Sequence, residues 1–504
     1  MSYSERHVLE TLIYLPMLAA LVLVFVPRPQ KTLIRWISIG SGLALLVMSL
    51  YAFVAFDYDG GSRFQLQRSY PWLDQLGIAF ALGIDGIAAP MVLLTGIVSL
   101  AGTIVAANIQ RDNKDYYILL FLLIAGVYGT FVSMDLFFFF FFYELAIVPM
   151  YLLIGIWGSS SKFKDFDRPK EYGALKLVMV IVAASLLIWI VIIGVHVESG
   201  TGSFNIEIIM ASIDHPSRFS GTFQSVMFLM TMVGFGTLAG MWPFHTWSPD
   251  GHVAAPTSVS MLHAGVLMKL GGFGIIRIGM MLLPDGLQEW ALLLFIIGTI
   301  NVIYGAVSAL AQHDLKYVIG YSSVSHMGYV FMGIASMTAV GLTGATLQMF
   351  AHGIMTALFF TIVGGIYERT HTRDTLVLNG LASKMKWGTA FFVIAGLASL
   401  GLPGLAGFVA ELLVFIGAFQ TQPILGALGV LGAAITAVYI LRLIGRTFYG
   451  DRDPKWDNLT DLTRREFIAA TILLIPLFYV GLYPQPLLRV IRPGVDAILA
   501  GLGL

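Results

Sequence analysis

Five ionisable side chains interrupt long apolar stretches of the sequence, where charge is costly. They are Glu144, Lys269, His326, His352 and Glu411. Counted at about 1.5 Å per residue from the polar end of its stretch, each lies roughly 13 to 20 Å deep in hydrocarbon about 30 Å thick. A charged group there costs about 2.5–3.5 kcal/mol unless water, a partner or a task offsets it. Acids, bases and imidazoles at one depth could pass protons along the membrane plane.

Three further histidines are weaker candidates for the same chemistry. His245 and His252 flank Asp250 in the segment WPFHTWSPDGH, where a proline interrupts an apolar stretch. Freed backbone groups and water would gather at such a break, which favours a vestibule over simple helix capping. His263 lies six residues before Lys269, about 240° around a helix, so ordinary packing is favoured over a place in the relay, which stays open.

The two deeper histidines also have simpler explanations. His326 and His352 could each be a hydrogen-bonded histidine in a packed core. They could also be axial ligands of a haem, although such sites usually have matched histidine pairs on two helices and each of these stretches offers one histidine.

The elements that hold these residues must be membrane helices. The chain has 504 residues, of which 57% are hydrophobic and 12% charged, with a mean hydropathy of +0.83. Soluble domains carry about 25% charged residues. Apolar runs of 18 or more residues recur and do not alternate with polar ones, which excludes a transmembrane β-barrel. We therefore expect an all-α polytopic membrane protein.

Charge and cysteine content exclude other classes. The 29 basic residues balance the 29 acidic ones, and there is no cysteine. Nothing therefore favours nucleic acid as a partner, and disulfides, cysteine-ligated iron–sulfur clusters and thiol nucleophiles are ruled out. The leader MSYSERHVLE is not positively charged and further apolar runs follow, so we expect the first run to be a retained helix rather than a signal peptide.

The apolar pattern predicts fourteen spans with two interruptions. Pro243 and Pro403 each break a span, and both fall in the fourth helix of a five-helix unit. Because each unit has an odd number of spans, the second must be inverted relative to the first, and paired breaks of this kind point to an ion path. The predicted spans are 8–27, 33–56, 86–107, 116–133, 134–157, 174–197, 222–245, 256–281, 288–311, 317–338, 343–368, 386–418, 424–446 and 466–488.

These spans divide the chain into four parts. They are an N-terminal three-helix segment (1–115), a first five-helix repeat (116–281), a second, inverted repeat (288–446) and a C-terminal helix (466–504). Twenty lysines and arginines lie on the side of the loops that follow odd-numbered spans, and seven lie on the side that holds both termini. The positive-inside rule therefore places both termini on the non-cytoplasmic side.

Six motifs in order resemble a known family. They are FFFFFFYELAIVPMYLLIGIWG, PFHTWSPDGH, AGVLMKLGGFGIIR, YSSVSHMGYV, YERTHT and SLGLPGLAGFVAEL. They resemble the antiporter-like membrane subunits of proton-translocating NADH:quinone oxidoreductase, complex I, and chain 4, the M type, above all. The resemblance covers essentially the whole chain. It implies fourteen helices with inverted repeats at helices 4–8 and 9–13, and it assigns relay positions to Glu144, Lys269, His326, His352 and Glu411.

The resemblance also implies an activity and its partners. The chain would be the proton-translocating subunit of a respiratory translocase, driven by redox energy released in other subunits, in a bacterial plasma membrane or an equivalent one. NADH, FMN, iron–sulfur clusters and quinone would be bound by those subunits, with no cofactor on this chain. Its partners would be L-type and N-type antiporter-like subunits and lipid. Two alternatives stay open: a D-type subunit of a multisubunit sodium/proton antiporter, and a non-pumping structural or haem-bearing membrane subunit.

One position departs from the family pattern. The family usually has a lysine in the seventh helix, seven residues before the histidine that matches His245, and that lysine pairs with the glutamate matching Glu144. Here the position is Leu238, and no lysine occurs between Leu177 and Met268. Either another group substitutes, with His263 the nearest candidate in the sequence, or this is an unusual paralogue with altered pumping. We expect a modified but working channel, because Lys269 and Glu411 remain.

Overall fold

The computed structural model describes residues 7–60, 62–162, 167–213, 219–451 and 453–503. Four of the basic residues counted above, Arg6, Lys164, Arg218 and Arg452, lie outside the described residues.

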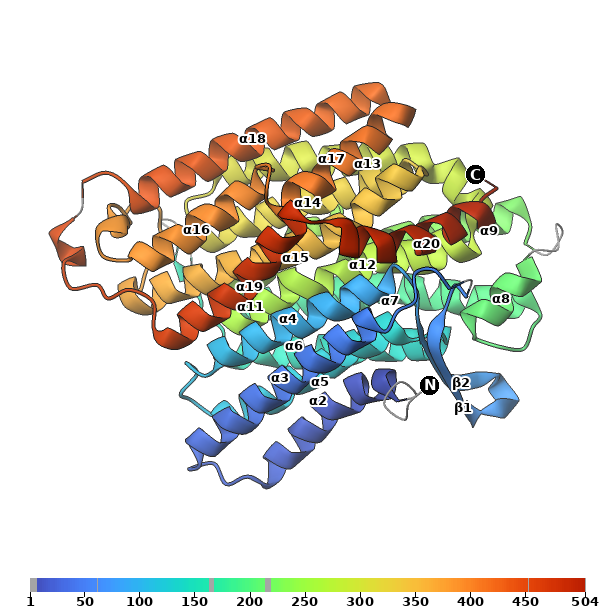
Figure 1. The fold of residues 1–504 in the computed structure, drawn as a ribbon, viewed down its shortest axis with the longest axis horizontal. Helices are drawn as coiled ribbons and strands as arrows, with labels where there is room; N and C mark the ends of the chain where they lie inside the picture. The colour runs from blue at the N-terminus through green and yellow to red at the C-terminus, as the bar shows by residue number, and fades with distance from the viewer. Residues whose placement is uncertain (1–6, 61, 163–166, 214–218, 452, 504) are drawn as a thin grey trace.

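Long apolar helices run side by side through the molecule and make up nearly all of it (Figure 1). In the described part of the chain, twelve helical segments are long and apolar enough to cross a membrane. They are α2 (Val8–Phe25), α3 (Lys31–Val54), α4 (Ala88–Ala106), α5 (Asn113–Val132), α6 (Leu136–Trp157), α7 (Lys170–Ser199), α9 (Gly221–Leu238), the composite segment Thr257–Met280, α13 (Pro284–Ala311), α15 (Ala339–Thr370), α18 (Pro423–Phe448) and α19 (Arg464–Leu482).

Two further helical segments cross beside these twelve and complete the predicted all-α membrane fold. One is α14 (Leu315–Ala335), which carries several serines and a histidine and is correspondingly less apolar. The other is the predicted twelfth span, which is divided into α16 (Lys386–Ser399) and α17 (Ala406–Thr421). Pro403 lies between these halves, where it cannot donate a backbone hydrogen bond.

The predicted seventh span is also broken. The helix α9 ends at Leu238, a short turn follows at Phe244–Thr246, and α10 (Trp247–Ala254) continues the crossing. The side chain of Asn301 on α13 serves the backbone exposed by this break: its Oδ1 accepts from the Trp242 amide at 2.6 Å and its Nδ2 donates to the Gly240 carbonyl at 3.0 Å. An interrupted helix is tolerated at membrane depth where buried groups satisfy the freed backbone in this way.

The predicted eighth span is continuous but irregular. It consists of α11 (Thr257–Leu262), a π-helical turn (His263–Leu267), α12 (Met268–Gly274) and a second π-helical turn (Ile275–Met280). Such π turns are rare and concentrate at functional sites. The most apolar 18 residues of this span are all buried, as are those of α4 and α15, so these three form the centre of the bundle.

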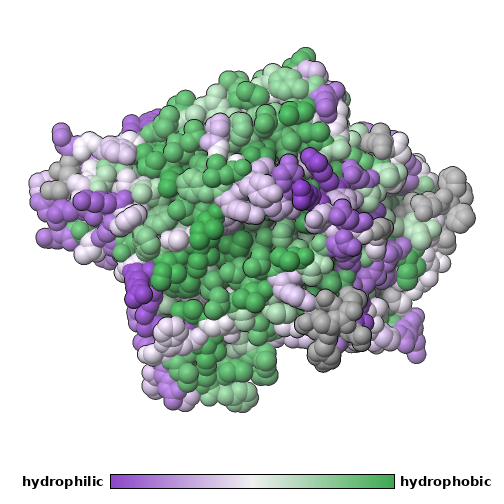
Figure 2. All heavy atoms as spheres, viewed as in Figure 1, coloured by the Kyte–Doolittle hydropathy of each residue, from purple (hydrophilic) through white to green (hydrophobic). Residues whose placement is uncertain are grey.

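An apolar surface surrounds the bundle. Figure 2 shows hydrophobic residues over the middle of the molecule and hydrophilic ones gathered toward its two ends. Exposed apolar side chains cover the outer helices, among them Leu21, Phe25, Leu43, Val47, Met179, Leu186, Leu431, Val438 and Ile475. Apolar surface of this extent matches lipid rather than water. The chain is an integral membrane protein.

Two features were not predicted. Strands β1 (Gln65–Leu73) and β2 (Ile78–Ile84) form an antiparallel hairpin between α3 and α4. The predicted last span, 466–488, is wrong at its end: α19 stops at Leu482 and a separate amphipathic helix, α20 (Gln485–Gly501), follows with charged Arg489, Arg492 and Asp496 on its exposed face. Prolines at 484 and 486 separate the two helices.

The remaining elements are short. They are the strands β3 (Ser161–Lys162) and β4 (Asp167–Arg168), the helix α8 (Ile206–Ile213), and single turns at Asp74–Leu76, Leu381–Ser383 and Pro454–Trp456.

Candidate functional site

A buried polar row begins at Lys269 in the centre of the bundle. The Lys269 side chain is fully buried on α12, and its ammonium donates to Nδ1 of His352 at 2.8 Å and to the carbonyl of Ala264. The carbonyl belongs to the π-helical turn just before α12. His352, on α15, lies next to His326 of α14, with ring centroids 5.2 Å apart. Three of the predicted residues are thus brought together on three helices.

The row ends at a glutamate beside the broken twelfth span. Nδ1 of His326 lies 3.3 Å from Oε1 of Glu411, and its Nε2 lies 3.0 Å from the hydroxyl of Ser399, the last residue of α16. The amide of Gln348 is 3.2 Å from the same Nδ1. Glu411 and His326 are both buried, so the imidazole joins the carboxyl group to the rest of the row.

A glycine makes room for that carboxyl group. Gly401 lies in the break between α16 and α17 with φ of +73°, a conformation that side chains disfavour. A Cβ atom at this position would lie 2.7 Å from Oε2 of Glu411, which is closer than non-bonded atoms approach. The Glu411 carboxyl group therefore occupies the space that any larger residue at 401 would need.

Two more of the predicted histidines form a contact of their own. The rings of His252 (α10) and His263 (first π turn) stack with centroids 3.9 Å apart and planes 30° apart, and both residues are fully buried. Trp247 covers the far face of His263 at 5.3 Å, and Phe360 covers His252 at 5.2 Å. The four imidazole nitrogens have no hydrogen-bond partner among the described residues.

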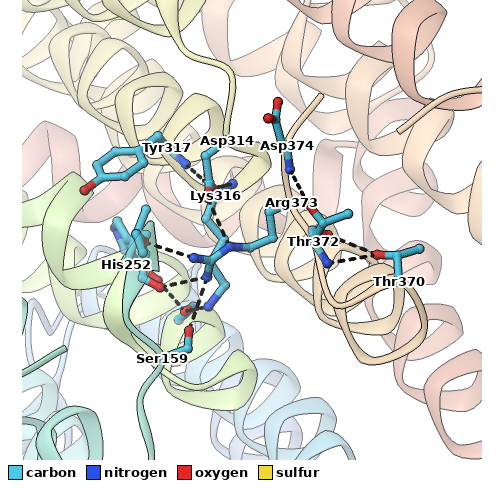
Figure 3. A network of polar contacts seen from close by, with 12 residues as sticks. Ser159, His252, Asp314, Lys316, Tyr317, Thr370, Thr372, Arg373 and Asp374 are labelled. Atoms are coloured by element: carbon cyan, nitrogen blue, oxygen red, sulfur yellow. Dashed lines mark hydrogen bonds and ion pairs between the residues drawn. The ribbon is translucent and has the colours of Figure 1, made fainter. Parts of the chain in front are cut away.

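A cluster of charged residues surrounds the end of α10 on the side of the basic loops (Figure 3). The Lys316 ammonium, buried at the start of α14, donates to the Ala255 carbonyl at 2.5 Å and lies 3.3 Å from the Ser260 hydroxyl. The guanidinium of Arg373 donates to Asp314 at 3.1 Å and to the Val253 carbonyl at 3.0 Å.

A second charged cluster, one turn away, is centred on Asp250. Its carboxylate accepts from Lys176 at 2.8 Å, from the Tyr317 hydroxyl at 2.8 Å and from Arg168. The sequence prediction named Asp250 in the broken segment but did not predict the two clusters, since Arg168, Lys316 and Arg373 fall at span ends and were counted as loop charges. The signal that could have found Lys316 is its place two residues after the helix-capping Asp314.

Two predicted residues lie apart from the row. Glu144 on α6 contacts the Ser185 hydroxyl on α7, and its Oε1 has no hydrogen-bond partner within the described ranges. His245 packs its ring against Tyr304 and Tyr321, with centroids 4.9 and 6.2 Å away. Leu238, at the position where the family lysine is expected, is fully buried.

The geometry of the histidines bears on the haem hypothesis. His326 presents its nitrogens to Ser399, Gln348 and Glu411, and His352 presents Nδ1 to Lys269. The two rings lie against each other rather than facing a common space. Over the described part of the chain, no group of three or more His, Asp or Glu side chains is placed to hold a metal ion.

One carboxyl group outside the spans has an unusual pKa. Asp135 caps the start of α6 by accepting from the amides of Phe137 and Phe138, and it also accepts from Ala79 of the hairpin. Burial raises the pKa of Asp135 to about 6, against the opposing effect of those amides.

Comparison with known proteins places this site in a family. The family model for the transmembrane part of NADH:quinone oxidoreductases and Mrp antiporters matches residues 133–436. The chain belongs to this family. Its matched region contains Lys269, His326, His352 and Glu411, and so includes the entire row.

Relatives of this NADH:quinone oxidoreductase/Mrp antiporter chain match it almost end to end. The chain is 35% identical to NAD(P)H-quinone oxidoreductase chain 4-2 of Synechocystis sp., with 95% of this chain and 89% of the relative covered. It is 37% identical to NAD(P)H-quinone oxidoreductase chain 4 2 of Thermosynechococcus vestitus, again with 95% and 89% covered.

Solved structures show the same arrangement of helices. A chain of respiratory complex I from Thermus thermophilus with bound NADH matches with a TM-score of 0.88 at 26% identity, covering 98% of this chain and 100% of that one. A chain of the Mrp complex from Dietzia sp. matches with a TM-score of 0.84 at 21% identity, covering 99% and 98%, and shows the shared fold.

Proposed function

We propose that this chain is the proton-translocating, chain 4-type membrane-arm subunit of a complex I-type quinone oxidoreductase. The observation that carries the proposal is the buried row Lys269–His352–His326–Glu411, whose members come from four helices and lie within hydrogen-bond or ring-contact distance of one another. Burying four ionisable groups together is costly in a membrane, so a row of this kind indicates a functional role for these residues. Curated relatives named as quinone oxidoreductase chain 4 support the same assignment.

The row can move protons because each neighbour can donate or accept. The Lys269 ammonium already donates to Nδ1 of His352, so a proton can pass along that hydrogen bond and leave Lys269 neutral. An imidazole takes a proton on one nitrogen and releases one from the other, which allows His352 and His326 to relay it. Glu411 receives it beside the break in the twelfth span, where the interrupted backbone can accommodate water.

The driving energy must come from elsewhere in the assembly. We propose that NADH, FMN, iron–sulfur clusters and quinone are bound by other subunits, and that L-type and N-type antiporter-like subunits are among the neighbours in the membrane arm. We further propose that both termini face the non-cytoplasmic side, since the loops rich in lysine and arginine lie at the opposite end of the helices. We also propose that the row spans two five-helix repeats of opposite orientation, 116–281 and 288–446.

A sodium/proton antiporter subunit is the alternative that shares this fold. The relatives at 34–37% identity are named as quinone oxidoreductase chain 4, whereas the Mrp complex chain matches at 21%. Purification of the native assembly separates the two: co-purifying subunits with iron–sulfur clusters and quinone-reducing activity support the proposal, and an assembly with sodium/proton exchange alone contradicts it.

The proposal is tested by neutralising the row in the assembled complex. Lys269→Met and Glu411→Gln should each lower the number of protons translocated per electron, measured in membrane vesicles from pH-dye quenching and quinone reduction together. Glu10→Gln is the matched control, because Glu10 is also a buried glutamate but lies at the start of α2, hydrogen-bonded to Tyr70. An unchanged ratio in both row variants would overturn the relay.

A further inference from the structure

A buried tyrosine on α18 is linked to the row through a serine. The hydroxyl of Tyr439 donates to the Ser322 hydroxyl at 2.7 Å and also contacts the hydroxyl of Ser399. The Ser399 hydroxyl in turn lies 3.0 Å from Nε2 of His326. All four side chains are buried. Hydroxyl groups thus continue from His326, past the end of α16, to α18.

The spacing of residues on α14 and α18 places these groups on facing sides of the two helices. Ser322 precedes His326 by four residues, so both lie on the same side of α14. Arg442 and Arg446 follow Tyr439 by three and seven residues, so the three share one side of α18. A polar stripe therefore runs from Tyr439 to the end of α18, on the side of the membrane that carries the basic loops.

A cavity connects this stripe to the basic side. It has a volume of about 20 Å³, and its lining includes Tyr439 and the polar residues Gln312, Arg442 and Arg446. A space of this size holds about one water molecule, which needs polar partners of the kind present here. Both arginines are exposed, so the cavity opens toward water at the end of the helices. Water in the cavity is therefore separated from His326 by one tyrosine hydroxyl and one serine hydroxyl.

The surroundings of Tyr439 differ from those of a tyrosine that is buried only for its ring. A buried phenol needs one hydrogen-bond partner, and Tyr128 on α5 has such a partner in the Ser49 hydroxyl, 2.7 Å away. The Tyr439 hydroxyl contacts the hydroxyl of Thr436 in addition to those of the two serines. Each hydroxyl can donate one proton and accept another, so the group around Tyr439 can pass a proton in more than one direction.

We propose that Tyr439 is a proton-carrying residue of this subunit, which takes protons from water on the basic side and passes them through Ser399 to His326. The inference rests on the proposed function. In each transfer a hydroxyl oxygen accepts one proton and releases its own to the next acceptor, so neither hydroxyl keeps a charge. Nε2 of His326 accepts the proton, and the opposite ring nitrogen, 3.3 Å from Glu411, releases one to that carboxyl group.

Substitutions that remove single hydroxyl groups test the proposal in the assembled complex. Tyr439→Phe keeps the ring and loses one oxygen atom, and Ser399→Ala interrupts the next link. Each should lower the number of protons translocated per electron as far as Glu411→Gln does, because the row is then cut off from its supply. Tyr128→Phe is the matched control, since Tyr128 is equally buried and its hydroxyl makes the same 2.7 Å contact with a serine, Ser49, outside the row.

A thiol reagent tests the side from which protons enter. The chain contains no cysteine, so Gln312→Cys places the only thiol of this chain in the wall of the cavity. A charged, membrane-impermeant methanethiosulfonate added from the basic side should lower the proton-to-electron ratio of this variant, measured before and after labelling. Gln110→Cys is the matched control, because Gln110 is an exposed glutamine in another basic loop, and labelling there should leave the ratio unchanged.

The outcomes separate this route from the relay. If the two row variants lower the ratio while Tyr439→Phe and Ser399→Ala match Tyr128→Phe, Tyr439 carries no protons and the relay stands. If labelling at position 312 leaves the ratio unchanged, the cavity is not the entrance and the inference is also refuted. If Tyr439→Phe fails to assemble, Ser399→Ala decides. If neither row variant lowers the ratio, the proposed function fails and the inference fails with it.

Discussion

Restoring the missing family lysine tests how α6 and α9 face each other. Leu238 ends α9, and the ring of Phe235, one turn earlier, lies 6.4 Å from that of Tyr143 on α6. Residues three apart on a helix share a face, and Glu144 directly follows Tyr143. We expect the long side chain of a lysine at 238 to reach around this contact to the Glu144 carboxyl group.

The size of the effect follows from burial. Leu238 is fully buried, so a lysine there without a partner should cost about 2.5–3.5 kcal/mol. A buried ion pair offsets most of that cost, whereas removing one partner of such a pair costs about 3–5 kcal/mol. We expect Leu238→Lys alone to change stability by less than about 1 kcal/mol, and Leu238→Lys with Glu144→Gln to lose about 3 kcal/mol.

A double-mutant cycle measures this coupling. Thermal unfolding of the purified complex is followed for the wild type, the two single variants and the double variant, and the non-additive part gives the interaction between positions 238 and 144. The expected coupling is about 2 kcal/mol or more. Additive effects within about 0.5 kcal/mol would refute the facing of α6 and α9 on which the calculation depends.

Three further predictions concern positions outside that pair. Asp135→Asn should flatten the pH dependence of stability, measured by thermal unfolding between about pH 4 and 7. Burial raises the pKa of Asp135 from 3.8 to about 6, so the protonated carboxyl group stabilises the folded state. This stabilisation is fully present below about pH 4 and is lost as pH rises through about 6, by at most about 3 kcal/mol. Gly401→Ala should displace the Glu411 carboxyl group, whose Oε2 would lie 2.7 Å from the new Cβ, and vesicle measurements should show reduced pumping while the complex still assembles. Arg277→Met should lower stability by about 3–5 kcal/mol, because it strands the buried Asp85 that Arg277 binds at 2.7 and 3.0 Å, and adding Asp85→Leu should recover most of the loss in the same unfolding assay.

The apolar pattern alone was sufficient to predict the helices, because each span must satisfy its own backbone in lipid. The depth of Lys269, His326, His352 and Glu411 followed from counting residues along those spans, and the structure places the four side chains in contact. Which helices meet was beyond the sequence, since contact depends on packing between segments far apart in the chain.

The same limit explains what was missed. Glu144 has the depth of a relay member, and in the structure its carboxyl group lies beside Ser185, a neighbour that depth alone could not predict. His263 was weighed by its angle on an ideal helix, yet the π-helical turn at His263–Leu267 changes that angle. The β1–β2 hairpin and α20 depend on short polar segments whose pattern is weak, so hydropathy gave no signal for either.

The two π-helical turns have a mechanical consequence for the residue between them. A wide turn of this type holds one residue more than an ordinary turn, and converting it back rotates the segment beyond it by about 100°, the angle of one residue. Lys269 lies on the regular stretch Met268–Gly274, with a wide turn on either side. Converting one π-helical turn to an α-helical turn, with a compensating change in the other, would rotate the Lys269 ammonium away from His352 while both ends of the helix keep their positions. A rearrangement confined to these two turns would thus give the charge at the centre of the bundle different neighbours without any helix sliding through the bilayer.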